Sequence, residues 1–270
     1  MKARLAVVVP CYNYGEFLQE AVGSVVDARR DDIELVIVDD GSTDPHTQRE
    51  VERLAREGFH VIQQENRGLA ATRDVGIRAT AADYILPLDA DNMIRPVFIE
   101  RALALLDARP QVGVVYGDAQ NFGARSDRWV TGPFDRERLM RWNYIDACAV
   151  LRRTVWEQNS GYDGTMPVQG LEDWDMWLGA MTRGWEFAYV PEIFFDYRVK
   201  RESMIVTSRK RSRATEEFIA RKHGMLYREA WLQLEHDRFS LRQCAGNLGR
   251  LLSRRIRNRL VNPAGRERER

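Results

Sequence analysis

Short apolar runs alternate with helix-patterned segments through the first 110 residues, and this alternation constrains the fold more than any other feature. The runs are residues 5–9, 33–38, 59–62 and 84–88, and each is followed by apolar residues at helical spacing. Continuous apolar runs are typical of strands that are covered on both faces. Repeated strand–helix units favour parallel strands joined by right-handed crossovers. The sequence therefore predicts an α/β fold with a mostly parallel central sheet and flanking helices.

The pattern becomes less regular after Pro110. Residues 117–133 are polar and predict a loop, as do the glycine-rich residues 159–170. Residues 173–182 place apolar side chains on one side of a predicted helix, and the chain beyond Met204 predicts amphipathic helices only. Further strands are predicted at residues 112–116, 147–151, 187–190 and 194–197. The second half is thus expected to add strands to the sheet and to end in a helical extension.

Size and composition are those of an ordinary globular chain. The 270 residues, 44% hydrophobic and 30% charged, suffice for one large α/β domain or two small ones. No apolar run approaches the roughly 18 residues that span a bilayer, and the apolar start is too short for a signal peptide. The three cysteines are odd in number and lack metal-ligand spacing, which suggests a reducing compartment. We therefore expect a cytoplasmic protein.

The net charge of +1 hides an asymmetry along the chain. From Ile205 onward there are 17 Lys and Arg against 7 Asp and Glu, which leaves 24 basic and 33 acidic residues before it. An acidic body therefore carries a basic tail, with clusters at residues 209–213 and 250–259. Such a tail predicts contact with an anionic membrane surface, or on charge alone with nucleic acid. A solvated helical extension or a homodimer contact is the simpler interpretation.

The apolar run at residues 84–88 is followed by two carboxylates, Asp89 and Asp91, separated by Ala90. Open α/β sheets bind ligands beyond the carboxyl ends of their strands, which is where these side chains would lie. The two carboxylates repel each other, and no ion-pairing partner stands beside them in the sequence. A bound Mg²⁺ or Mn²⁺ would remove this conflict, since both prefer hard oxygen ligands. The alternative is that the pair caps a turn and the following helix.

Two other predicted strands end in polar residues that would share this edge of the sheet. Tyr12 follows the first strand, and Asp39 and Asp40 end the second. An aromatic ring, a carboxylate and a metal site together suit a nucleotide diphosphate. Tyr12 would stack on the base, Asp40 would accept from a base N–H, and the metal would bridge the phosphates. The alternatives are a partly buried core aromatic and an ordinary turn before a capped helix.

Several enzyme classes are disfavoured by motifs that the sequence lacks. No Gly-x-Gly-x-x-Gly follows the first predicted strand, and neither Gly-x-x-x-x-Gly-Lys-Ser/Thr nor Gly-x-Ser-x-Gly occurs. This disfavours dinucleotide oxidoreductases, P-loop NTPases and α/β-hydrolases. The four histidines lie apart and form neither a metal nor a triad pattern.

A second acidic cluster, Glu172-Asp173-Trp174-Asp175, lies where the glycine-rich segment meets a predicted helix. In the simplest interpretation one of these acids caps the helix. A carboxylate beside Trp174 and Trp177 is partly desolvated, however, which raises its pKa and its basicity. The cluster is therefore a candidate general base.

Taken in order, seven segments resemble the pattern of family 2 glycosyltransferases over about residues 5 to 204. They are Val7-Val8-Val9-Pro10-Cys11-Tyr12-Asn13, Val36-Ile37-Val38-Asp39-Asp40-Gly41-Ser42-Thr43-Asp44, Asn66-Arg67-Gly68-Leu69-Ala70-Ala71-Thr72-Arg73-Asp74, Leu88-Asp89-Ala90-Asp91-Asn92, Gly161-Tyr162-Asp163, Glu172-Asp173-Trp174-Asp175 and Tyr197-Arg198. Each segment is modest alone, but the combination is specific. The resemblance implies the GT-A fold, with a Rossmann-like sheet, and inverting transfer from a nucleotide-diphosphate sugar, often UDP-linked, with Mn²⁺ or Mg²⁺.

The resemblance also implies roles for particular positions. Asp91 matches the direct metal ligand, and Asp89 shares the metal motif and lies nearer the ribose. Asp173 matches the catalytic base, with Glu172 and Trp174 on the acceptor side. The implied donor-binding residues are Pro10, Tyr12, Asp40, Gly68, Arg73, Asp89, Ala90, Arg198 and Lys200. The chemistry agrees, because inversion needs one base for the acceptor hydroxyl and one charge-stabilising group for the leaving diphosphate.

Two positions depart from the family pattern. Asp74 stands where asparagine is usual, and it would either shift contacts to the pyrophosphate or simply cap. Lys200 stands where histidine is common, and a charged lysine does not ligate a metal. Lys200 would instead contact the diphosphate directly. Arg198 would do the same or would pin its loop.

On this interpretation residues 1–110 form the donor-binding half of one GT-A domain and residues 111–204 its acceptor-binding and catalytic half, followed by the basic helical extension at residues 205–270. The expected partners are a nucleotide-diphosphate sugar and a hydroxyl acceptor, such as a lipid-linked glycan in cell-surface or secreted glycan synthesis. The extension would place the protein at the inner face of the membrane, and nucleic acid is not expected.

Two other function classes stay open from the sequence. A sugar-phosphate nucleotidyltransferase carries a basic, glycine-rich loop after its first strand, whereas residues 10–15 contain no Arg or Lys. A non-catalytic sugar-nucleotide scaffold would have no need of the metal and base motifs. Release of free nucleoside diphosphate from a donor separates a transferase from a scaffold.

Overall fold

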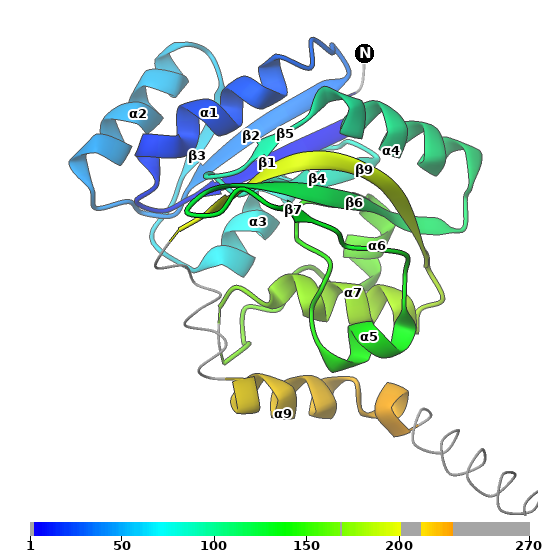
Figure 1. Cartoon of the computed structure of the whole chain (residues 1–270). Helices are drawn as coiled ribbons and strands as arrows, with labels where there is room; N and C mark the ends of the chain where they lie inside the picture. The colour runs from blue at the N-terminus through cyan, green and yellow to red at the C-terminus, as the bar shows by residue number, and fades with distance from the viewer. Residues whose placement is uncertain (1–2, 168, 201–211, 229–270) are drawn as a thin grey trace, which may run out of the picture. The chain divides into compact units, whose positions relative to one another are not determined.

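The computed structural model describes residues 3–167, 169–200 and 212–228 (Figure 1). The chain divides into two compact units, Met1–Lys222 and His223–Arg270. Of the predicted helical extension, the structure describes helix α9 (Ser212–Lys222). The basic clusters that the sequence places in the tail lie almost entirely outside the described residues, so the predicted membrane contact stays a prediction. Within the described part, no helix combines the length and the apolar character that crossing a bilayer requires.

The first part of the sheet is built from parallel strands, as predicted. Neighbouring strands follow the order β3-β2-β1-β4, and every pair among them is parallel. Because these strands are parallel, their carboxyl ends lie at one edge of the sheet. The elements are β1 (Leu5–Cys11), α1 (Gly15–Val26), β2 (Ile33–Asp39), α2 (Pro45–Arg56), β3 (His60–Gln63), α3 (Leu69–Arg78) and β4 (Tyr84–Pro87).

The second part makes the sheet mixed. Strand β8 (Val150–Arg152) lies between β4 and β6 (Val112–Gly123) and is antiparallel to both. Strand β9 (Glu186–Val199) pairs with β6 in parallel and with the two-residue β5 (Met93–Ile94) in antiparallel fashion. The described strands thus continue the sheet as β4-β8-β6-β9-β5, with β7 (Arg128–Trp129) paired to β6.

Two predictions for this part were wrong. Much of the predicted loop at residues 117–133 belongs to β6, and the two short strands predicted at residues 187–190 and 194–197 are one strand, β9. The polar residues of β6 suggested an exposed loop, but one of them, Asp118, is fully buried within the strand. Its carboxylate accepts hydrogen bonds from the Arg128 guanidinium (2.6 Å), the Thr131 backbone N–H (2.9 Å) and the Tyr189 hydroxyl (2.8 Å).

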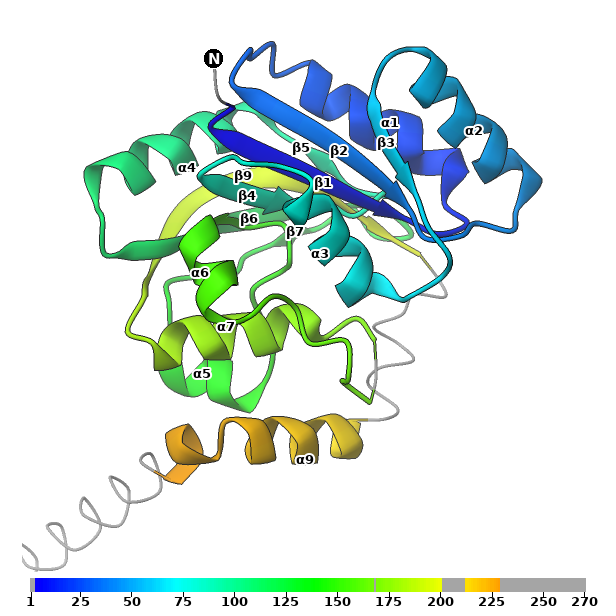
Figure 2. The same cartoon turned by 180° about the vertical axis from the view of Figure 1, so that it is seen from behind.

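Helices cover both faces of the sheet (Figures 1 and 2). On one face lie α1, α2 and α4 (Pro96–Ala108), and on the other lie α3 and α6 (Arg153–Gln158). Helix α7 (Glu172–Thr182) is next to the short α5 (Arg136–Arg141). The sequence predicted neither α5 nor α6, which are only six residues long and too short for a clear period.

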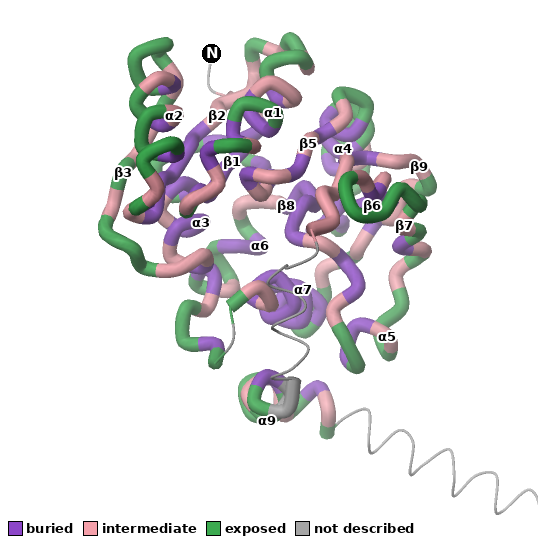
Figure 3. The backbone as a smooth tube through the Cα atoms, turned by 60° about the vertical axis from the view of Figure 1, so that its left-hand side comes forward, coloured by how far each residue is buried: buried purple, intermediate pink, exposed green. Residues whose placement is uncertain are grey.

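The core runs along the strands, and burial extends into α7 (Figure 3). All but the last residue of α7 is buried, including three carboxylates in its first turn. At the other end of the chain, Asp44 caps α2 by accepting from the Thr47 N–H, with Pro45 in the first turn. Burying a carboxylate is unfavourable unless it has hydrogen-bond or ion-pair partners. The three carboxylates in the first turn of α7 are therefore candidates for a functional site.

Candidate active site

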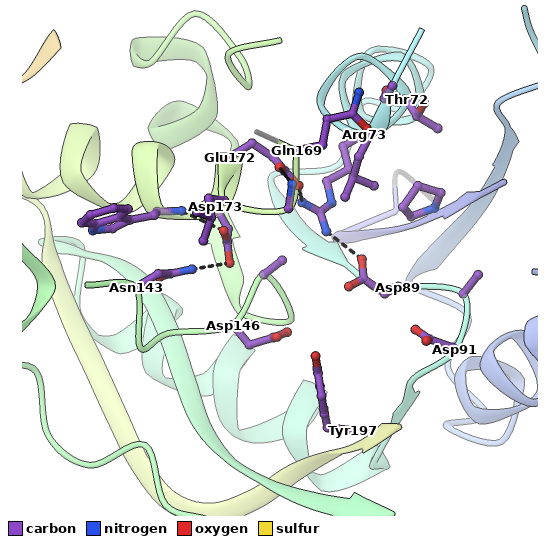
Figure 4. A pocket seen from close by; sticks show the side chains of 18 of the residues that line it. Thr72, Arg73, Asp89, Asp91, Asn143, Asp146, Gln169, Glu172, Asp173 and Tyr197 are labelled. Atoms are coloured by element: carbon purple, nitrogen blue, oxygen red, sulfur yellow. Dashed lines mark hydrogen bonds and ion pairs between the residues drawn. The ribbon is translucent and has the colours of Figure 1, made fainter. Parts of the chain in front are cut away.

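A cavity of about 910 Å³ opens at the carboxyl ends of β1, β2 and β4 (Figure 4). This volume lies within the range of small-molecule sites. Every residue that the sequence predicts for the site lines the cavity. They are Pro10, Tyr12, Asp40, Gly68, Arg73, Asp89, Ala90, Asp91, Glu172, Asp173, Trp174, Arg198 and Lys200. The fold thus brings these positions together, while the roles of the individual side chains stay predictions.

The carboxylate of Asp40 holds the loop that precedes α3. It accepts from the backbone N–H groups of Arg67 (2.8 Å) and Gly68 (2.9 Å) and from the Gln64 side chain (2.7 Å). Gly68 has φ +83°, and the Gln169 side chain lies 2.6 Å from the place a Cβ would take. A larger residue at position 68 would therefore be strained by this backbone conformation, and the flexible Gln169 side chain would have to move. Tyr12, 45% exposed, keeps its ring open to solvent.

Arg73 ties the turn after β4 to the first turn of α7. Its guanidinium is 2.6 Å from Asp89 Oδ1 and 2.5 Å from Glu172 Oε1, and its side chain is only 2% exposed. The guanidinium also lies 5.6 Å from the centre of the Tyr162 ring. A buried cation shared by two carboxylates fixes the relative position of three segments that are distant in the sequence.

Asp91 also has an ion-pair partner, the ammonium group of Lys200. The Lys200 ammonium nitrogen lies 3.2 Å from Asp91 Oδ2. Burial and the neighbouring Asp89 carboxylate raise the pKa of Asp91, and Lys200 opposes that rise. Since Arg73 pairs with Asp89, both carboxylates of the turn have ion-pairing partners. The sequence argument did not include these two partners, because they come from α3 and from the residue that follows β9.

The donor set of the turn nevertheless fits a divalent cation that a substrate helps to hold. Among the described residues, no group of three or more His, Cys, Asp or Glu side chains is gathered to bind a metal. Asp89 and Asp91 offer two carboxylates beside open cavity space. Mg²⁺ is usually held by one or two carboxylates together with substrate phosphates, which is the arrangement these two residues permit.

Arg198 holds the turn after β4, which carries Asp89 and Asp91. Its backbone N–H donates to Asn92 Oδ1 (3.0 Å) and its Nε–H to the Asp91 carbonyl (3.1 Å). Its guanidinium also pairs with Glu20 of α1 at 2.6 Å and lies 4.3 Å from the centre of the Phe17 ring. Of the two roles considered for Arg198, these contacts favour the one that holds the turn in place.

Asp173 lies on the opposite wall of the cavity, in the first turn of α7 (Figure 4). It is 7% exposed, and it accepts from Asn143 Nδ2 (2.8 Å) and from the Trp174 backbone N–H (2.9 Å). Burial and the adjacent Glu172 raise the pKa of Asp173 well above its usual range, against the opposing effect of Arg73. A carboxylate with a raised pKa is a stronger base once it is deprotonated.

The two neighbours of Asp173 are anchored. One Glu172 oxygen pairs with Arg73 and the other accepts from the Gly170 N–H at 2.8 Å. The Trp174 indole donates to the Leu139 carbonyl at 2.6 Å and is 5% exposed. Both side chains thus hold the start of α7 in place. Among the described residues, Asp173, in contrast, accepts hydrogen bonds from neutral donors only.

Among the polar residues of the cavity that the sequence did not predict are Asn143 and Asp146. In Figure 4, Asp146 lies between the Asp89 and Asp173 sides. Burial, followed by repulsion from Asp89, raises the pKa of Asp146 to about 7. Asp146 precedes a predicted strand rather than following one, so it was not expected at this edge. Because β8 runs antiparallel to β4, the residues before β8 lie beside those after β4. Aromatic residues were also missed, namely Trp129, Trp142 and Tyr144.

Asp74 belongs to the scaffold. It does not line the cavity, and its carboxylate accepts from the Trp156 indole (2.7 Å), the Tyr162 N–H (3.0 Å) and the Arg78 guanidinium (2.8 Å). Gly161, at φ +88°, packs directly on this carboxylate, where a Cβ would collide. These contacts support neither of the two roles considered for Asp74, which lies within α3 and away from the cavity lining. Its hydrogen bonds instead anchor the segment that leads to α7.

Comparison with known proteins identifies the family. The sequence model of glycosyl transferase family 2 matches residues 6–166, more than half of the chain. The chain belongs to glycosyl transferase family 2. It is 31% identical over 115 residues to an uncharacterized glycosyltransferase of Nostoc, alr2836, and 32% identical over 124 residues to the glycosyltransferase GlyG of Streptococcus pneumoniae. These alignments cover 42% and 45% of this chain but only 36% and 41% of the two relatives.

Solved structures confirm the GT-A fold. The mannosyltransferase PcManGT from Pyrobaculum calidifontis, in complex with GDP-Man and Mn²⁺, matches with a TM-score of 0.62 and 21% identity, over 87% of this chain and 71% of that one. S. aureus TarS in complex with UDP-GlcNAc matches with a TM-score of 0.60 and 19% identity, over 77% and 61%. At this identity the likeness establishes the fold, which confirms the fold class that the sequence predicted.

Proposed function

We propose that this member of the family is an inverting, metal-dependent glycosyltransferase that moves a sugar from a nucleotide-diphosphate sugar to a hydroxyl acceptor. The observation that supports this most is the placement of two kinds of carboxylate on opposite walls of one cavity. Asp89 and Asp91 are paired with cations on the donor wall, and Asp173 is buried among neutral donors on the other. A transferase needs both, one set to bind the donor and one base for the acceptor.

The donor side of the proposal uses the strand ends. Tyr12, partly exposed after β1, stacks on the base, while Asp40 fixes the loop before α3 and offers its remaining lone pairs to a base N–H. A UDP-sugar is the first choice of donor. Among proteins of the same fold, TarS was solved with UDP-GlcNAc and PcManGT with GDP-Man, so both nucleotide classes belong in the test.

Asp91 and Asp89 would hold Mn²⁺ or Mg²⁺ together with the donor diphosphate. When bound, the cation stabilises the negative charge that develops on the leaving nucleoside diphosphate. The chain supplies the support for this site. Arg73 holds Asp89 from the protein interior, and Arg198 holds the Asp91 carbonyl and Asn92, so the turn is preorganised before the donor arrives.

Asp173 is the proposed base. It removes the proton from the acceptor hydroxyl as the oxygen attacks the anomeric carbon, and the leaving group departs from the opposite face. Asn143 orients the carboxylate by its hydrogen bond to Oδ2, and the buried position keeps the base away from bulk water. The raised pKa of Asp173 brings its basicity closer to that needed for an alcohol. The acceptor would be a hydroxyl of a growing glycan, in cell-surface or secreted glycan synthesis.

The test begins with donor binding. A thermal-shift screen of UDP-, GDP- and dTDP-sugars with Mn²⁺ should show one class that raises the unfolding temperature, since a ligand of the folded state stabilises it by mass action. The selected donor is then incubated with the enzyme, with and without candidate glycan acceptors, and free nucleoside diphosphate is measured. Binding without any nucleoside diphosphate release would favour a scaffold, and formation of nucleoside triphosphate and sugar phosphate when pyrophosphate is added would indicate a nucleotidyltransferase.

A further inference from the structure

The ammonium group of Lys200 is enclosed by three groups of the donor wall. It lies 3.2 Å from Asp91 Oδ2, 3.4 Å from the centre of the Tyr14 ring and 4.3 Å from the centre of the Phe17 ring. Two aromatic faces and one carboxylate form a cage that suits a monovalent cation. The carboxylate in this cage is the same one that the proposed function assigns to the divalent metal.

The position of Lys200 is set by the secondary structure around it. Strand β9 pairs with β5, and Arg198 then bonds to the Asp91 carbonyl and to Asn92. Two residues later, Lys200 reaches the carboxylate of Asp91 from the same strand end. The backbone of the turn and its side chain are thus contacted by two different cations, Arg198 and Lys200.

These two cations and Arg73 differ in their freedom to move. Arg73 is 2% exposed and is shared by Asp89 and Glu172, and Arg198 is held by Glu20 and by the turn backbone. The Lys200 side chain is 23% exposed, and Asp91 is its ion-pair partner among the described residues. A lysine ammonium on a flexible four-carbon stem has more freedom to change partner than these two guanidinium groups.

We propose that Lys200 acts as an internal counter-cation that occupies Asp91 and makes divalent-metal binding there conditional on the nucleotide diphosphate. This inference rests on the proposed function, since it concerns the same metal site. In the nucleotide-free protein, a dication at Asp91 must lie beside the ammonium group or displace it, and both are unfavourable electrostatically. A bound diphosphate brings negative charge, so the ammonium moves to a phosphate oxygen and Asp91 becomes available to the metal.

The experiment measures Mn²⁺ binding directly, by the electron paramagnetic resonance signal of free Mn²⁺. It compares the wild-type protein with Lys200→Met, which removes the charge, and with Lys200→Arg, which keeps it. Each is titrated alone and with whichever of UDP, GDP or dTDP raises its unfolding temperature. Thermal unfolding of each variant checks that the fold is intact, which is expected because Lys200 is partly exposed.

We expect the wild-type protein to bind Mn²⁺ weakly alone and more tightly with nucleotide. Lys200→Met should raise the nucleotide-free affinity by about tenfold to a hundredfold, the scale on which a neighbouring charge shifts an ionic equilibrium. Lys200→Arg should remain close to wild type. The factor by which nucleotide strengthens Mn²⁺ binding should therefore fall in Lys200→Met, and by linkage Mn²⁺ should strengthen nucleotide binding by the same smaller factor.

Three failures are distinguishable. If nucleotide supports Mn²⁺ binding but Lys200→Met leaves the nucleotide-free affinity unchanged, the counter-cation role is wrong and the metal site stands. If nucleotide binds and Mn²⁺ binds in no state, the metal part of the proposed function is wrong as well. If no nucleotide binds to a folded protein, the proposed function itself is overturned.

Discussion

The two walls of the cavity hold their carboxylates in different ways. On the donor wall, Asp89 and Asp91 each lie within ion-pair distance of a cation, Arg73 and Lys200 respectively. On the opposite wall, Asp173 accepts from an amide side chain and from a backbone N–H. Carboxylates that lie beside cations suit the binding of cationic ligands, whereas a buried carboxylate with a raised pKa exchanges a proton more easily. The difference between the walls thus matches binding on one side and proton transfer on the other.

The largest effect is expected at Asp173. Asp173→Asn keeps the shape and the neutral surroundings but removes the base, so transfer should fall by about a hundredfold to ten-thousandfold. Donor affinity, measured by calorimetry, should stay close to wild type. The free energy of unfolding at neutral pH should not fall, because a raised pKa means that the folded state disfavours the ionised form. Near wild-type transfer in this variant would remove Asp173 as the base.

Asp175 offers a matched control in the same turn of α7. Its carboxylate is also buried, but it pairs with Lys222 at 2.7 Å and does not line the cavity. Asp175→Asn should lower the stability while leaving the rate constant of the folded enzyme nearly unchanged. Equal losses of activity in the two variants would indicate that both act through the fold of α7.

Arg73 tests the link between the walls. Arg73→Met leaves Asp89 and Glu172 without their shared cation, and breaking a buried pair costs about 3–5 kcal/mol. Urea unfolding measures this loss. Arg78→Met is the comparison, because Arg78 pairs with Asp74 from a 58% exposed position, where a pair contributes about 0–1 kcal/mol. If Arg73→Met lowered the free energy of unfolding by no more than Arg78→Met does, Arg73 would not stabilise the contact between the walls.

A change at Asp91 tests metal binding on the donor wall. Asp91→Asn removes one negative oxygen without changing the shape, so Mn²⁺ affinity in the presence of nucleotide should fall at least about tenfold. The pKa of Asp173 on the opposite wall should be unaffected, which the pH dependence of residual transfer would show. An unchanged Mn²⁺ titration would exclude Asp91 as a metal ligand.

The smallest effect is a shift in pH dependence. The Asn143 hydrogen bond lowers the pKa of Asp173, so Asn143→Ala should raise it further. Transfer needs the deprotonated base, so kcat/KM rises with pH through this pKa, and the acidic limb of the profile should move to higher pH by up to about one unit. Asn159→Ala is the control, since Asn159 contacts Met176 of α7 and does not line the cavity. It should leave the limb in place.

The donor wall was easier to predict from sequence than the opposite wall. Its residues follow apolar runs with a clear period, and parallel strands bring their carboxyl ends to one edge regardless of the details of packing. Tyr12, Asp40, Asp89 and Asp91 therefore all line the cavity as expected. The opposite wall is made from short elements and loops. Asn143 and Asp146 precede an antiparallel strand whose direction no local pattern reveals.

By itself, the sequence determined the α/β class, the parallel strands β1 to β4 and many of the residues around one cavity, because local periodicity and short motifs encode them. Tertiary structure alone decided the charge partners. Arg73 lies 16 residues before Asp89 and 99 before Glu172, and Lys200 meets Asp91 only because β9 pairs with β5. Ion pairs act over a few ångströms and leave no periodic trace in the chain, so the balance of charge in the site becomes visible only when the strands are assembled.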